Sequence, residues 1–262
     1  MKRIILIAFC AIIATSCSKY SSNQNGLDSN IKKTTRTTYS NEQLLNNIGM
    51  IHNQIMEFAF NKIKNEHLFN TFNSESDAIT FSTNATHQFM LSQNIVDPSI
   101  TTVNQLLAAY DNNLGMPENQ NQTYTNAVNQ ILNLVETYTG SPSQFNQDAT
   151  ILFNSNFANI SDPIEQNSYR ATYLVAVSSY QYWFNNLDKW NDEYYDQTGS
   201  RKAKPPTAGE VGKADAVGAA IWGYSGAVSG TFIIPGIGSL AGGILGASYG
   251  AAICSLTKAI VG

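Results

Sequence analysis

The strongest constraint on this chain is a long stretch near its C-terminus that carries no charged side chain. The forty-two residues 216–257 lie between Asp215 and Lys258 and contain no Asp, Glu, Lys or Arg. A soluble helix of such length normally keeps a polar face toward water. The stretch must therefore bury most of its surface, either in protein or in lipid.

A turn divides this stretch into two arms of similar length. Pro235 cannot continue a helix and Gly236 permits a tight bend, so the pair predicts the turn of a hairpin. The arms, 216–234 and 237–257, contain 19 and 21 residues. At about 1.5 Å per residue, each helical arm is about 30 Å long, which matches the hydrocarbon core of a bilayer. We therefore predict an apolar helical hairpin within a C-terminal segment, 214–262.

Glycine recurs along both arms at a spacing of four residues. The glycines expected to mediate helix–helix packing are Gly226, Gly230, Gly238, Gly242, Gly246 and Gly250. Each glycine costs a water-exposed helix about 1 kcal/mol relative to alanine, but a glycine stripe lets two helices approach closely. Residues 212–257 resemble the glycine-zipper segments of membrane-inserting bacterial proteins and the apolar cores of class II bacteriocins. That resemblance implies contact with membrane lipid and a homo-oligomer formed through the stripe.

Three arrangements of this hairpin are open from the sequence. It can insert into a bilayer, it can pack against the rest of the chain as two buried helices, or it can remain a disordered tail. Its large apolar residues argue against disorder. Its length and lack of charge favour insertion.

The N-terminus has the pattern of an export signal. A basic start, Met1–Arg3, precedes a ten-residue apolar run that is too short to span a bilayer. The following Ala14-Thr15-Ser16-Cys17 resembles the lipobox of bacterial lipoproteins, in which the cysteine receives acyl chains such as palmitate. The resemblance implies a signal peptide at 1–16, lipidation of Cys17 and a location in the cell envelope at the outer membrane. The alternative is an ordinary secretory signal that is cleaved near Ser16.

Residues 17–39 are polar and lack periodicity, which suits a flexible tether between the lipid and a folded domain. Residues 40–199 then show the apolar spacing of helices. In the first expected helix the apolar face consists of Leu44, Ile48, Ile51, Ile55, Phe58 and Ile63. Another helix is expected to begin at Ser99, and the longest at Asp162-Pro163, an N-cap followed by proline. We predict an all-α bundle of five to seven helices, a basic proline-containing linker at 200–213 and then the hairpin.

Few residues indicate chemistry. The histidines His52, His67 and His87 are too far apart for a local metal motif, so we expect no metal site and no cofactor. The aromatic stretch 180–195 either forms core or binds a sugar or a peptide. Charged residues are only 13% of the chain and the net charge is −4, which argues against nucleic-acid binding. If Cys17 is acylated and the leader with Cys10 is removed, no intrachain disulfide is possible.

The segment Ile48-Gly49-Met50-Ile51-His52-Asn53 resembles the opening of uncharacterised Bacteroidota lipoproteins, which pair a helical domain with a glycine-rich end. His52 and Asn53 can equally cap or pack within the first helix. We expect a membrane-anchored bacterial lipoprotein with a non-catalytic structural or interaction role, whose C-terminal hairpin inserts in or associates at a membrane. The alternative is a bacteriocin-like toxin or pore former, although hydroxyl groups along the hairpin are few for a wide aqueous pore.

Overall fold

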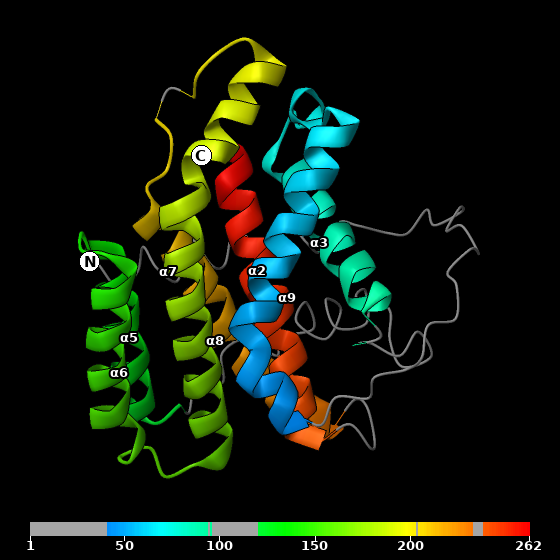
Figure 1. The fold of residues 1–262 in the computed structure, drawn as a ribbon. Coiled ribbons are helices and arrows are strands. Elements are labelled where there is room, and N and C mark those ends of the chain that lie inside the picture. The colour runs from blue at the N-terminus through cyan, green and yellow to red at the C-terminus, as the bar shows by residue number, and fades with distance from the viewer. Residues whose placement is uncertain (1–40, 94, 96–119, 203, 233–237) are drawn as a thin grey trace.

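The computed structural model describes residues 41–93, 95, 120–202, 204–232 and 238–262. These residues form an all-α bundle without strands, as the periodicity predicts (Figure 1). The helices, in chain order, are α2 (Asn41–Glu66), the short 3-10 helix η1 (Leu68–Thr71), α3 (Glu75–Ser92), α5 (Gln122–Thr137), α6 (Pro142–Phe157), α7 (Pro163–Thr198), α8 (Ala208–Phe232) and α9 (Gly238–Val261). The helix expected at Ser99 and the residues of the signal peptide and tether lie outside the described residues.

Local capping residues set where the helices begin. The Asp162 side chain accepts hydrogen bonds from the backbone N–H groups of Ile164 and Glu165, with proline at the first position of α7. Ser141 starts α6 with a capping box, and Ser74 caps α3. Gly199 ends α7 in the left-handed conformation, with φ of 70°. The N-cap predicted at Asp162 is therefore confirmed.

The two longest helices of the N-terminal part, α2 and α7, run parallel. Near their starts Arg170 contacts Glu42 at 3.0 Å, and near their ends Gln197 donates to the carbonyl of Ile63 at 3.2 Å. In Figure 1, α5 and α6 lie on one side of this pair and α3 lies on the other. Every residue predicted for the apolar face of α2 is buried except Phe58, which is half-buried.

The hairpin helices α8 and α9 run antiparallel and pack inside this arrangement. α8 contacts α5 and α7, while α9 contacts α2, α3 and α7. Residues 246–257 of α9 are all buried, and side chains of both arms belong to the same hydrophobic cores as the other helices. The described hairpin is thus helical and packed, which rules out the disordered tail. Insertion into a bilayer stays a prediction.

The boundary between the linker and the hairpin differs from the sequence expectation. α8 begins at Ala208, inside the segment 200–213 that we expected to be a linker, and Val211 is fully buried. The remaining linker passes the end of α9, where Lys202 donates a hydrogen bond to the carbonyl of Ala259. Burial, together with the neighbouring Lys258, lowers the pKa of Lys202 to about 8. The hairpin and the helical domain consequently pack against each other in shared hydrophobic cores.

Among the described residues, one helical segment is long and apolar enough to cross a membrane. This segment, Leu240–Val261, has a mean hydropathy of 1.5, and 83% of its most apolar window is buried in the protein. A core helix of a soluble protein has the same length and composition. The hydropathy of α9 is therefore weak support for a membrane span.

Candidate functional site

Glycines hold α8 and α9 at close range. A side chain at Gly218 would collide with the backbone of Gly250, and one at Gly226 would collide with the carbonyl of Gly242. A Cβ at Gly250 would lie 2.6 Å from the Cβ of Trp222. Because these neighbours are mostly backbone, only hydrogen fits at these positions. The two helices consequently touch along much of their length.

The predicted stripe residues fall in three groups. Gly226 and Gly242 face each other, Gly246 lies beside them, and Gly250 faces α8 at Gly218. Gly230 and Gly238 lie in the last turn of α8 and at the start of α9, but their surroundings are outside the described residues. The predicted turn residues Pro235 and Gly236 and the predicted lipidation site Cys17 are also outside them. The described stripe packs within one chain, and the homo-oligomer stays a prediction.

A buried polar cluster joins the N-terminal third of α8 to α2 and α7. We call it the His52–Asp215 cluster, and its members are His52 and Asn53 from α2, Ser179 and Trp183 from α7, and Asp215 from α8. The His52 Nε2 atom lies 2.7 Å from Oδ1 of Asp215. The other carboxylate oxygen, Oδ2, accepts hydrogen bonds from the Trp183 indole N–H at 2.8 Å and from the Ser179 hydroxyl. The His52 and Asp215 side chains are both 0% exposed.

The hydrogen bonds around His52 indicate that its ring carries both protons. Its Nε2 atom faces the Asp215 carboxylate, and its Nδ1 atom lies 3.1 Å from Oδ1 of Asn53. The Asn53 amide is oriented by its Nδ2 group, which donates to the carbonyl of Ser178 at 3.1 Å. Both ring nitrogens therefore face acceptors, and only the imidazolium has two N–H donors.

The charges around the ring agree with this protonation. Burial acts to lower the pKa of His52, but the Asp215 carboxylate and the hydrogen bonds to Asp215 and Asn53 together raise it above its ordinary value of 6.5. The cluster is thus an ion pair whose charges are enclosed and hydrogen-bonded. Such a pair fixes geometry more than it adds stability, because removing two charges from water is costly.

The arrangement of Ser179, Asp215 and His52 does not activate a nucleophile. The Ser179 hydroxyl donates to Asp215, and His52 contacts the opposite carboxylate oxygen, so the ring is not placed to take the hydroxyl proton. All three side chains are also closed to solvent. The geometry fits a structural connection between helices.

The motif Ile48-Gly49-Met50-Ile51-His52-Asn53 supplies the α2 side of this contact. A Cβ at Gly49 would lie 2.6 Å from the Leu174 carbonyl oxygen, so glycine lets α2 approach α7 closely. His52 and Asn53 follow on the same face. The motif therefore acts in helix packing, and the sequence reasoning missed its partner Asp215. The sequence held one indication of this contact, because His52 and Asp215 both lie on the apolar faces of their helices, where a titratable side chain needs a partner.

The other candidate residues do not converge on a site. His67 is exposed after the end of α2, and His87 contacts the Tyr249 hydroxyl at 3.0 Å. In the described portion of the chain, no group of three or more His, Cys, Asp or Glu side chains could hold a metal ion. In the aromatic stretch, Tyr180, Tyr182, Trp183 and Trp190 are core residues, whereas Phe184 and Tyr195 are about half exposed. Most of that stretch is therefore core.

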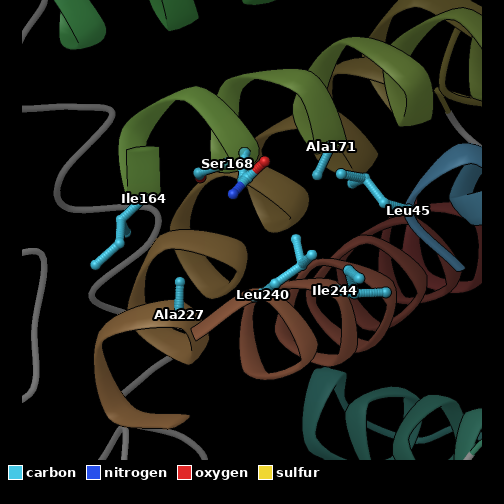
Figure 2. Close-up of a pocket in the computed structure, with 9 residues that line it drawn as sticks. Leu45, Ile164, Ser168, Ala171, Ala227, Leu240 and Ile244 are labelled. Atoms are coloured by element: carbon cyan, nitrogen blue, oxygen red, sulfur yellow. The ribbon is translucent and has the colours of Figure 1, made fainter. Parts of the chain in front are cut away.

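A small apolar cavity lies where α2 and α7 meet the hairpin. Figure 2 shows Leu45 from α2 and Leu240 and Ile244 from α9 around it, with Ser168 of α7 as a polar neighbour. Its volume is about 10 Å³, which is room for about one water molecule. It is too small for an organic ligand.

Comparison with known proteins adds no assignment to this geometry. No family profile, no curated protein and no solved structure matches the chain. The resemblances to Bacteroidota lipoproteins and to glycine-zipper proteins therefore stay expectations from the sequence.

Proposed function

We propose that this chain is a non-catalytic lipoprotein of the bacterial cell envelope, anchored at the outer membrane through acyl chains on Cys17. The leader sequence supports export and acylation. Two or three acyl chains give stable anchoring, since each buried methylene contributes about 0.8 kcal/mol. The helical bundle then acts as a structural or interaction module at the membrane surface.

The observation that carries this proposal is the enclosure of the hairpin by the other helices. α9 contacts α2, α3 and α7, and its residues 246–257 are buried. A hairpin that already fills the core is not required as a second anchor, so the lipid is sufficient. The buried polar groups are used in helix packing, which supports a role without catalysis.

A second candidate is a membrane-active protein whose hairpin leaves the bundle and inserts into a bilayer. The observation that favours it is the self-contained pairing of α8 with α9. Their glycine contacts connect the two arms directly, and the arms carry no charge between Asp215 and Lys258. The pair could therefore exchange its covering helices for lipid without breaking its own interface.

Fractionation of the full-length protein tests both candidates. We expect the wild type to incorporate labelled palmitate and to pellet with membranes. Cys17→Ala should lose the label and become soluble, while Cys254→Ala, which changes the buried cysteine of α9, should keep the label. A wild type that is unlabelled and soluble would reject the lipid anchor. A Cys17→Ala protein that stays in membranes after alkaline washing would favour the inserted hairpin.

A further inference from the structure

The polar contacts between the hairpin and the other helices differ in kind. The Ala220 carbonyl lies 3.4 Å from the Ser168 hydroxyl, and the buried Tyr249 hydroxyl lies 3.0 Å from the half-buried ring of His87 on α3. Lys213 pairs with Glu136 at 2.6 Å, but both side chains are partly exposed. Of the ion pairs in the described residues, only that of the His52–Asp215 cluster is fully buried on both sides.

This ion pair lies where the uncharged stretch of the hairpin begins. Asp215 is the last charged residue before the uncharged stretch 216–257, and it binds α2 and α7 at once through His52, Ser179 and Trp183. The rest of the hairpin is held mainly by apolar contacts, which are non-directional. The ion pair fixes the register, because a shift of one helical turn would leave a charge buried without its partner.

The position of Asp215 at the end of the uncharged stretch is compatible with both the helical bundle and a bilayer. If the uncharged stretch enters a bilayer, Asp215 comes to the edge of the hydrocarbon core, where a carboxylate can stay hydrated. Within the bundle, however, the carboxylate is held by three donors. The hairpin cannot leave before those hydrogen bonds break.

We propose that the His52–Asp215 cluster is a latch that keeps α8 and α9 inside the helical bundle, and that its opening frees the hairpin to enter a lipid bilayer. The latch rests on the second candidate function, insertion of the hairpin. Its two parts, local holding of the hairpin and transfer to lipid, are measured separately.

Hydrogen–deuterium exchange measures the holding. His52→Gln keeps the size of the side chain but leaves the Asp215 carboxylate without its counter-charge. Loss of one partner of a buried pair should raise the opening equilibrium about a hundredfold or more. We expect amides of α8 and α9 to exchange faster by that factor, while those of α6, which contacts α5 and α7, change much less. Equal acceleration in α6 would overturn the latch, because the pair would then stabilise the whole bundle.

Two matched variants keep the test valid if His52→Gln folds poorly. Lys189→Met removes the Glu57–Lys189 ion pair, which joins α2 to α7 at 2.7 Å but is partly exposed. It should leave hairpin exchange unchanged. The double variant His52→Leu with Asp215→Leu leaves no buried charge unpaired, so its hairpin should exchange more slowly than that of His52→Gln. Fast hairpin exchange in Lys189→Met would overturn the latch, because loss of a different ion pair between α2 and α7 would then free the hairpin as well.

Flotation with vesicles of phosphatidylethanolamine and phosphatidylglycerol measures the transfer, in a Cys17→Ala background that lacks the acyl anchor. We expect His52→Gln to float with the vesicles while the Lys189→Met and double-leucine proteins stay in solution. Fast hairpin exchange without flotation would support the latch as a holding device and reject hairpin insertion. Flotation of all variants alike would overturn control by the cluster.

Discussion

Replacing Gly226 by alanine should show whether the glycines of the hairpin serve the close approach of α8 to α9. The new Cβ would lie 3.0 Å from the Gly242 carbonyl carbon, nearer still to its oxygen, and 3.3 Å from the Cα of Gly246. All three neighbours are backbone atoms of α9 and cannot rotate away. The control is Gly223→Ala in the same helix, where the Cβ would lie 3.1 Å from the Ala247 methyl group.

Two opposing terms set the size of the effect. Alanine in place of glycine stabilises a helix interior by about 1 kcal/mol. Overpacking a core costs about 1–3 kcal/mol, and Gly226 should lie near the upper value because only a separation of α8 from α9 relieves the clash. The net loss for Gly226→Ala is therefore about 2 kcal/mol. At Gly223 the methyl contact needs a shift of a few tenths of an ångström, so gain and cost should cancel to about zero.

Urea unfolding of both variants measures the difference directly. Gly226→Ala should lower the free energy of unfolding by about 2 kcal/mol with an unchanged slope against urea, and Gly223→Ala should match the wild type. If Gly226→Ala were as stable as Gly223→Ala, α8 and α9 would not approach each other as closely as the structure has them. The glycine spacing would then not be needed for packing between the two arms.

Three further changes probe the cluster, the stripe and the core. The free energy of unfolding should fall as pH rises through the folded-state pKa of His52, because that pKa is raised above 6.5 by Asp215 and the protonated ring is the form that pairs; pH-dependent urea titrations should show the slope in wild type and not in His52→Gln. Gly242→Leu with Gly246→Leu should abolish cross-linked oligomers, and unchanged cross-linking would reject association through the stripe. Trp190→Ala should lower the free energy of unfolding by about 3–5 kcal/mol in urea titrations, since the ring is 1% exposed; a loss below about 1 kcal/mol would contradict its place in the core.

Most of the helices could be predicted because the spacing of apolar residues along each segment indicates a helix. Ile48 and Ile55 recur at the intervals of one helix face, and both are fully buried. Asp162 could be recognised as an N-cap because capping uses residues that are adjacent in the chain. Such signals need no knowledge of what the helix packs against.

The partner of His52 could not be found in this way because it lies 163 residues away. Periodicity places His52 on the buried face of α2, and it places Asp215 at the start of an apolar helix, but it does not say that the two faces meet. A buried histidine and a buried aspartate each require a partner of opposite charge or a hydrogen bond. The contact between His52 and Asp215 could be predicted from the sequence only by matching buried titratable residues on distant helices that each need a partner.

Local sequence patterns also could not predict whether the hairpin packs within the bundle or enters lipid, because lipid and a protein core both favour an apolar surface. The absence of charged residues from a stretch indicates only that its side chains avoid water. Whether protein can cover them depends on the apolar faces that other helices offer. Here α7 presents buried residues to both cores of the bundle, including Trp183 in one and Tyr180 in the other, so α8 and α9 find enough partners within the chain. Counting the unpaired apolar faces of the covering helices is therefore a better guide to the resting position of such a hairpin than its own length or hydropathy.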